Sequence, residues 1–312
     1  MATLTPIGNV NIRVLVNDQL DNIAPSWNDQ VAAPGLFSHV PLRKLDEEEK
    51  LGRAGAEHEL HLPNSCCGAH GLSLMITVGK EDSKHTILFD AGPEGGLEKA
   101  IGLINSHKPE SKGPVAVDLH PNRPEFRGMM TPRGPVTLEA DPTIAQLETA
   151  GAKIDLNTDA HAILGQMFYV SGEIPRTTSY ETGIANGIRL DTKEVGWQED
   201  PLIMDERFVM CHLEGKGLVV FTGCSHAGVV NVMRHAVELG GGIPLFAIVG
   251  GFHLTDANIQ KLESTVADFK LIQPTVIMPG HCTGWRFQVE SEKTLPGRVV
   301  PLYCGQKYGL TS

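Results

Sequence analysis

The chain has 312 residues, 41% of them hydrophobic and 20% charged, so it is long enough for a sizeable core and has the composition of a globular protein. Its formal net charge of −11 argues against nucleic acid or an anionic membrane surface as the main partner. No apolar run reaches the roughly 18 residues that cross a bilayer and no secretory signal is visible, so with six cysteines and no CxxC pair we expect a cytoplasmic protein that binds a small molecule.

The predicted elements begin with an alternating strand over residues 11–18, followed by a polar excursion of about residues 19–65. Two β-rich runs then flank the polar turn "KEDSK" and predict a hairpin, and the stretch "GGLEKAIGLINSH" predicts a helix. An inserted region of about residues 113–200 comes next. A second hairpin and alternating helices and strands complete the chain, which predicts one layered α/β (α+β) domain over residues 1–312.

Three strands in the last third of the chain end in glycine and are followed at once by a histidine. These are "LVVFTGCSH", "LFAIVGGFH" and "TVIMPGH", which deliver His226, His253 and His281. Glycine lets the backbone turn sharply there, and neutral imidazole is a common ligand for zinc and iron. The pattern favours metal binding for His226 and His281. His253 could be a ligand, or it could hold an anion beside a helix that we expect to begin at Thr255.

Four more residues are candidates for the same site, and each allows two interpretations. Cys224 and Cys282 could supply thiolate ligands or be small buried residues next to the site. Asp90, which follows the strand "TILF", could orient a metal ligand or cap its own turn. His70 could point into the same cleft or have a structural role.

The motifs together resemble the metallo-β-lactamase superfamily, and within it the branch of 7,8-dihydropterin-6-methyl-4-(β-D-ribofuranosyl)aminobenzene-5′-phosphate synthases. The matching stretches occur in family order over roughly two thirds of the chain: "HGLSLMI", "ILFDAGP", "GPVAVDLHP", "SGEIPRTTSYE", "LVVFTGCSHAGVVN", "VGGFHL" and "MPGHCTGW". The resemblance implies an αββα sandwich of two mixed sheets flanked by helices, with a metal site along one edge.

The same resemblance implies roles for particular residues. His226 and His281 would be ligands of a divalent metal, zinc in the first place and manganese or iron as alternatives. His253, Arg176 and His120 would surround the substrate pocket. Asp90, His70, Cys224 and Cys282 are expected in the second shell of the metal.

One departure from the family concerns its signature, an HxHxDH loop that supplies most ligands of a two-metal site. The chain has no such motif, because "FDAGPE" is joined directly to "GGLEKAIGLI" between Glu94 and Gly95. We therefore expect a helix, a strand and the loop to be missing near residue 94, which would expose a strand edge. A catalytic zinc usually needs three protein ligands, so we expect weak or no metal binding and impaired catalysis.

Two functions follow from these observations. The first is a metal-dependent hydrolase or transferase that acts on a small anionic substrate, phosphorylated or pterin-like, with no catalytic residue assigned. The second is a non-catalytic member of the fold that binds a small anion or is structural. A serine hydrolase is disfavoured, because "GCSHAG" does not fit the G-x-S-x-G pattern. The sequence leaves the oligomeric state open.

Overall fold

The structure is a computed structural model that describes residues 2–21, 24–33, 42–54, 56–60, 68–80, 83–92, 96–109 and 113–312. The predicted junction between Glu94 and Gly95 lies outside the described residues, as do Cys66 and Cys67. Within the described part, no helix has the length and apolar character needed to cross a membrane.

A four-stranded sheet forms the first layer, with every described pair antiparallel. Its order is β18 (Lys307–Thr311), β1 (Asn9–Val16), β4 (Ser73–Lys80) and β5 (Ser83–Phe89). The strand β1 alternates as its sequence predicts, with Val10, Ile12 and Val14 buried. The predicted hairpin is confirmed by the pairing of β4 with β5.

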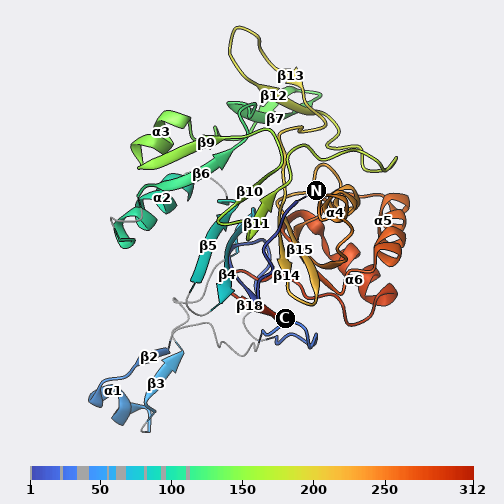
Figure 1. Cartoon of the computed structure of the whole chain (residues 1–312). Coiled ribbons are helices and arrows are strands. Elements are labelled where there is room, and N and C mark those ends of the chain that lie inside the picture. The colour runs from blue at the N-terminus through green and yellow to red at the C-terminus, as the bar shows by residue number, and fades with distance from the viewer. Residues whose placement is uncertain are drawn as a thin grey trace.

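A six-stranded mixed sheet forms the second layer (Figure 1). Its order is β10 (His161–Ile163), β11 (Phe168–Val170), β14 (Val209–Leu213), β15 (Gly217–Thr222), β16 (Leu245–Gly251) and β17 (Val276–Gly280). The last three strands are parallel and buried along their whole length, which explains their nearly continuous apolar sequences.

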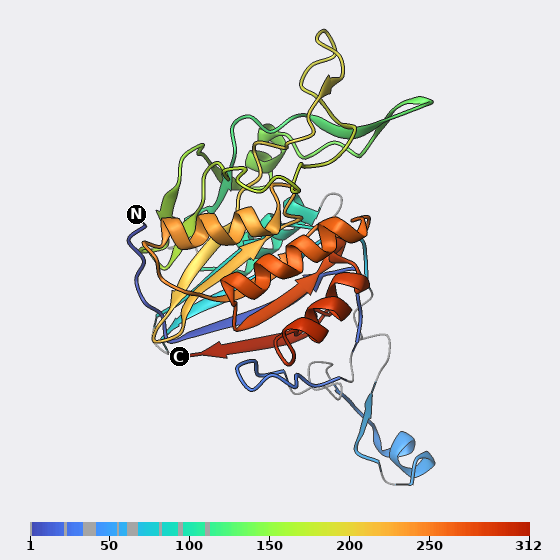
Figure 2. The same ribbon diagram turned by 90° about the vertical axis from the view of Figure 1, so that its right-hand side faces the viewer.

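Three helices cover the outer face of the second sheet, as Figure 2 shows. They are α4 (Val229–Leu239), α5 (Ile259–Ile272) and α6 (Trp285–Thr294). The outward side chains of the sheet pack with buried faces of the helices in one core, and the inner faces of the two sheets form the other. The layers are thus sheet, sheet and helix, each burying one apolar face against the next.

The last strand of the first sheet, β5, has β4 as its hydrogen-bonded neighbour among the described residues and so lies at an edge. Ile87 and Phe89 on β5 are only partly buried against the core, whereas Leu74 and Ile76 on β4 are fully buried. An edge strand with a partly open core is what the predicted loss of a neighbouring strand would leave.

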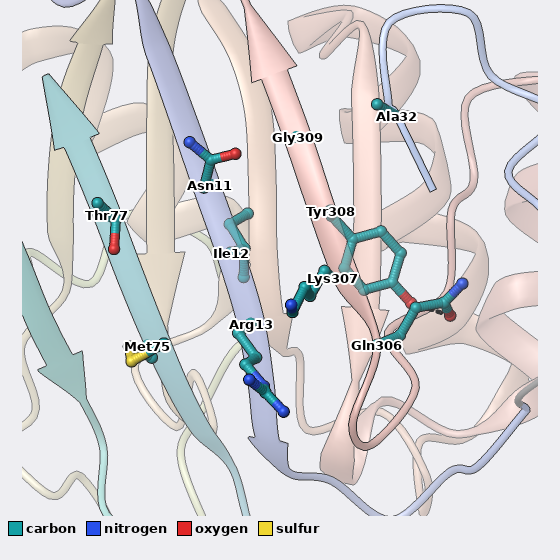
Figure 3. Close-up of a pocket in the computed structure, with 10 residues that line it drawn as sticks. All are labelled: Asn11, Ile12, Arg13, Ala32, Met75, Thr77, Gln306, Lys307, Tyr308 and Gly309. Atoms are coloured by element: carbon teal, nitrogen blue, oxygen red, sulfur yellow. Dashed lines mark hydrogen bonds between the residues drawn. The ribbon is translucent and has the colours of Figure 1, made fainter. Parts of the chain in front are cut away.

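The outer face of the first sheet is polar and hollowed into a pocket (Figure 3). Arg13 and Asn11 from β1, Thr77 and Met75 from β4 and Lys307 from β18 line it. These are the side chains that alternate with the buried ones, so one face of the sheet contacts the core and the other carries polar groups.

Two further parts lie outside the layers. The first is a small hairpin with a helix, which Figure 1 shows apart from the sheets at the lower left: β2 (Leu42–Lys44), α1 (Glu47–Gly52) and β3 (His58–Leu60). The second contains two small sheets and two helices: α2 (Gly96–His107), β6 (Val115–Leu119), β7 (Phe126–Thr131), β8 (Gly134–Thr137), α3 (Ile144–Thr149), β9 (Ala152–Leu156), β12 (Gly187–Leu190) and β13 (Gln198–Glu199). The division into one domain with an excursion and an insertion stays a prediction.

Candidate functional site

The ends of four strands meet at one edge of the two sheets. The parallel strands β15, β16 and β17 finish there, and the end of β1 joins them from the first sheet. The side chain of Asn17, just after β1, is fully buried and makes this connection. Its Oδ1 accepts from the N–H of His281 at 2.7 Å and its Nδ2 donates to the carbonyl of Leu302 at 2.8 Å.

His281 lies at the centre of this edge, with 9% of its surface exposed. Its Nδ1 is 2.9 Å from Asp18 Oδ1 and its Nε2 is 2.8 Å from Cys224 Sγ. The other oxygen of Asp18 is 2.8 Å from Nδ1 of His70, whose side chain is 82% exposed. The rings of His70 and His281 are 4.7 Å apart. The carboxylate therefore fixes the ring so that Nε2 points at the sulfur.

Cys224, His281 and Cys282 form what we call the thiol cluster. Their two sulfur atoms and one ring nitrogen all lie within 4.8 Å of one another. Cys282 Sγ accepts a hydrogen bond from the N–H of His253 at 3.3 Å. Three groups of a kind that binds soft cations are thus brought together from two different strand ends.

The contacts within the thiol cluster shift the pKa values of Cys282 and His281 in opposite directions. A hydrogen bond from Cys224, with others from His253 and His281, holds the pKa of the Cys282 thiol well below its ordinary value of 9.0, against the effect of burial. Burial lowers the pKa of His281, but the hydrogen bond and charge of Cys282 and those of Asp18 prevail and raise it to about 9. The hydrogen bonds of the cluster thus favour the charged forms of Cys282 and His281.

His226 and His253 form a second group, which we call the histidine pair. Their rings meet edge to face with centroids 4.8 Å apart. Glu206 is 3.1 Å from Nδ1 of His226, and its carboxylate also accepts from the N–H groups of His226 and Ala227. Burial raises the pKa of Glu206, but the charge and hydrogen bonds of His226 outweigh it, so the pKa lies below its ordinary value of 4.5.

The backbone at this edge is strained. Asp90, Ser225, His253 and His281 all have positive φ angles, between 45° and 59°, although none is glycine. Such conformations are uncommon for side chains with a Cβ atom and cluster at functional sites. Gly251 lies at the same edge and leaves no room for a side chain. A Cβ atom there would lie 3.0 Å from Cys282 Sγ and 2.5 Å from the carbonyl oxygen of Gly223.

The expected helix start at Thr255 is wrong. Helix α5 begins at Ile259, and its N-cap is Asn258, whose side chain accepts from the N–H of Lys261. The hydroxyl and the N–H of Thr255 instead bond the carbonyl of Cys282. The hydroxyl that would cap a helix is thus used to hold the loop that carries the thiol cluster, and His253 does not lie at a helix N-terminus.

Two predicted residues approach the edge from other elements. One carboxylate oxygen of Asp90 accepts from the N–H groups of Ala91 and Gly92, and the other faces Gly223 of the "GCSH" loop. Arg176 donates from Nη1 to the carbonyl of His226 at 3.0 Å and from Nη2 to a second carbonyl. Its Nε is buried and has no hydrogen-bond partner among the described residues.

His120 is placed differently. It follows β6 in the inserted region, and its Nδ1 accepts from the N–H of Asn122. Burial lowers the pKa of His120 below its ordinary value. The negative charge of Asp205 raises this pKa, but the positive charges of Arg207 and Arg189 lower it. Its described contacts are with the insertion and the segment before β14, so a role in substrate binding stays a prediction.

Sequence reasoning missed three residues that organise the site: Asn17, Asp18 and Glu206. A signal was present for two of them, because the strand "NIRVLV" ends directly in Asn17 and Asp18, as "TILF" ends in Asp90. Glu206 gave no comparable signal, since it precedes a strand instead of following one.

The described residues do not fit a two-metal centre. The groups of three or more metal-binding side chains are the thiol cluster and the trio of Asp18, His70 and His281, and both contain the same histidine. His226 belongs to neither, and its Nδ1 is engaged by Glu206. The donor set fits one cation at His281, and no second set of three completes a partner site in the described part of the chain.

The comparisons with known proteins agree with this architecture. No family model matches the sequence. The chain is 25% identical over 285 residues to the 7,8-dihydropterin-6-methyl-4-(β-D-ribofuranosyl)-aminobenzene-5′-phosphate synthase of Methanocaldococcus jannaschii, covering 74% of this chain and 89% of that protein. The uncharacterized protein MJ0448 of the same organism is 35% identical over 117 residues, covering 38% of this chain and 40% of its own length.

A solved structure decides the fold. The crystal structure of Tm1679, a metal-dependent hydrolase of the β-lactamase superfamily, matches with a TM-score of 0.64 and 18% identity, covering 97% of this chain and all of the other. The chain has the metallo-β-lactamase fold. The resemblance found in the motifs and the predicted fold class are thereby confirmed, except that the first sheet is antiparallel in its described pairs, where two mixed sheets were expected.

Proposed function

We propose that the chain is a metal-dependent hydrolase or transferase of the metallo-β-lactamase fold that acts on a small anionic substrate, phosphorylated or pterin-like. The observation that carries this proposal is the meeting of β1, β15, β16 and β17 at His281, which brings ring nitrogens, thiols and a carboxylate to one edge. The likeness to a dihydropterin phosphate synthase supports the substrate class. Ligand sites in sheets with parallel strands lie at such strand ends.

The residues present can hold a metal at His281, with Cys224 and Cys282 on one side and Asp18 behind the ring. A bound zinc ion would act as a Lewis acid toward an ester or phosphoryl oxygen. Zinc is favoured because the donors are soft sulfur and imidazole nitrogen, whereas manganese prefers oxygen ligands. Iron is the alternative that the same donors allow.

Positive charge for an anionic substrate would come from Arg176. Its guanidinium is anchored to the carbonyl of His226, and its buried Nε is free of protein partners among the described residues. The exposed His70 borders the same edge and would supply a further N–H donor. In our proposal, Arg176 and His70 bind and orient the substrate, and Glu206 keeps His226 in position.

The test is a phosphatase and phosphodiesterase screen with the full chain, including pterin phosphates, after loading with zinc, manganese or iron. We expect turnover with zinc, and a loss of at least about 100-fold in kcat/KM for His281→Ala, since removing an interaction made in the transition state costs about that much. His107→Ala, an exposed histidine on α2, is the matched control. Absence of turnover on every substrate, with metal bound, would contradict the proposal.

A second candidate is a non-catalytic protein that binds a small anion on the same scaffold. It is favoured by one observation, the absence of the HxHxDH motif from the sequence. Calorimetry with phosphate esters and pterin phosphates separates the two, because a binding protein would retain affinity for them without turning any of them over.

A further inference from the structure

The thiol cluster has the composition and spacing of a mononuclear site. Zinc bonds to sulfur at about 2.3 Å and to imidazole nitrogen at about 2.0 Å, so tetrahedral donors lie roughly 3.6 to 3.8 Å apart. The donor atoms of Cys224, His281 and Cys282 lie within 4.8 Å of one another, and Nε2 of His281 is 2.8 Å from Cys224 Sγ. Shifts of about 1 Å in the side chains bring all three into the bonding sphere of one ion.

The groups around the cluster are those that a bound cation requires. A ligating histidine almost always hydrogen-bonds a carboxylate or carbonyl through its other nitrogen, and Asp18 occupies that position on Nδ1 of His281. A ligating thiolate is stabilised by N–H donors, and the N–H of His253 donates to Cys282 Sγ. Both groups therefore lie where the supporting partners of a bound cation would be expected.

We propose that Cys224, His281 and Cys282 bind a single thiophilic divalent cation, with zinc as the expected ion, in a Cys₂His site that leaves a fourth position open. This assigns both cysteines as ligands, which is one of the two roles that the sequence left open. The inference deepens the proposed function, on which its catalytic meaning rests, by naming the ligands of the metal. It also explains how a metallo-β-lactamase fold without the HxHxDH motif retains a metal.

The charges of such a site are balanced. Two thiolates neutralise a divalent ion, so the buried edge gains no net charge when both cysteines and the cation are counted. The histidine pair is the poorer site for a thiophilic ion, because it offers ring nitrogens and no sulfur donor. Hard cations such as magnesium and calcium prefer oxygen ligands and should be rejected.

Cobalt(II) is the probe that tests the inference, because thiolate ligands give it an intense near-ultraviolet charge-transfer absorption that nitrogen and oxygen ligands do not. The full chain is reduced with a phosphine, stripped of metal and titrated with cobalt, then with zinc. We expect one cobalt per chain with a two-thiolate spectrum, and its displacement by zinc. Cys224→Ser and Cys282→Ser should each halve the absorption and weaken zinc at least about tenfold.

Cys304→Ser is the matched control, because this cysteine is buried outside the cluster and its loss should leave the spectrum unchanged. Asp18→Asn keeps all three ligands and should weaken zinc by about 10–100-fold, as loss of a supporting carboxylate does. Circular dichroism of every variant confirms that it is folded. If a cysteine variant is unfolded, zinc binding by Asp18→Asn still tests the inference.

Each outcome has a distinct meaning. Cobalt binding without charge-transfer absorption, or a spectrum that survives both cysteine substitutions, would overturn the inference and point to the histidine pair. A two-thiolate spectrum in a protein that turns over no substrate would leave the inference standing and refute the proposed function. Turnover that is insensitive to Cys224→Ser and Cys282→Ser would refute the inference and leave the proposed function standing.

Discussion

The thiol cluster and the histidine pair are neighbours at one edge, yet they satisfy their polar groups in different ways. In the thiol cluster, Asp18 holds the outer nitrogen of His281 and leaves the inner one facing sulfur. In the histidine pair, Glu206 engages the ring of His226 and the backbone of the same loop. The first arrangement places sulfur next to the free side of the ring, and the second ties the ring to the backbone of its own loop.

The comparison shows that histidines after glycine-ended strands can have different polar surroundings at the same edge. His226, His253 and His281 share this sequence pattern and lie at the same edge of the sheets. His226 and His281 each meet a carboxylate at Nδ1, and what separates them is that Nε2 of His281 faces Cys224 Sγ at 2.8 Å. Three substitutions test this difference, ordered from the largest expected effect to the smallest.

Asn17→Ala should have the largest effect, because it removes the link that holds His281 against β1. The substitution leaves the buried N–H of His281 and carbonyl of Leu302 without partners, at about 1–3 kcal/mol each, so the free energy of unfolding should fall by about 2–6 kcal/mol. Urea denaturation measures it. Asn11→Ala, at an exposed position on β1, is the control and should change stability by less than about 0.5 kcal/mol.

Glu206→Gln tests the histidine pair and should lower the free energy of unfolding at pH 7 by about 1–3 kcal/mol, because the amide replaces a buried acceptor of two N–H groups. The effect should depend on pH. The folded pKa of Glu206 lies below 4.5, so its contribution is complete above that pH and is lost as the pH falls through the folded pKa.

Denaturation curves between pH 3 and 7 check this dependence, and the loss of stability on acidification should be smaller in Glu206→Gln than in the wild type. Glu214→Gln, in the exposed turn between β14 and β15, is the control. Parallel curves for the wild type and Glu206→Gln would show that this carboxylate carries no pH-dependent stability.

Asp18→Asn should have the smallest effect on the free energy of unfolding, since Asp18 is partly exposed. It should have a clear effect on the pKa of His281. The carboxylate helps raise the pKa of His281 to about 9, so its loss should move that pKa down toward 6.5. A raised pKa stabilises the fold at low pH and loses this effect as the pH rises through about 9, so the variant should lose it at a lower pH.

Imidazole proton shifts in the reduced, metal-free protein report the titration of His281 directly. Asp29→Asn, at an exposed position, is the control. An unchanged pKa of His281 in Asp18→Asn would show that the two cysteines alone raise this pKa. It would also show that Asp18 does not orient the ring.

Much of the fold could be predicted because its signals are local. Alternation in β1 and the polar turn between β4 and β5 gave the first hairpin, and apolar runs ending in glycine gave the parallel strands. The start of α5 could not be predicted, because Thr255 and Asn258 are both good N-caps and the choice depends on the distant carbonyl of Cys282.

The site was predicted in part for the same reason. Strand ends identified His226, His253 and His281, because parallel strands finish at one edge. The orientation of each ring depends on Asp18 and Glu206, which approach from β1 and from the segment before β14. Such long-range partners leave no periodic pattern in the sequence, so the convergence of Cys224 and Cys282 on one ring nitrogen required the structure.

The left-handed backbone at Asp90, Ser225, His253 and His281 has a consequence for engineering. Glycine at any of these positions would relieve strain of roughly 1–2 kcal/mol while deleting the side chain. Heat resistance and binding chemistry therefore make opposite demands on the same four positions. A screen that rewards thermal tolerance alone should enrich glycine along this edge, whereas a screen that rewards cation retention should enrich the strained residues.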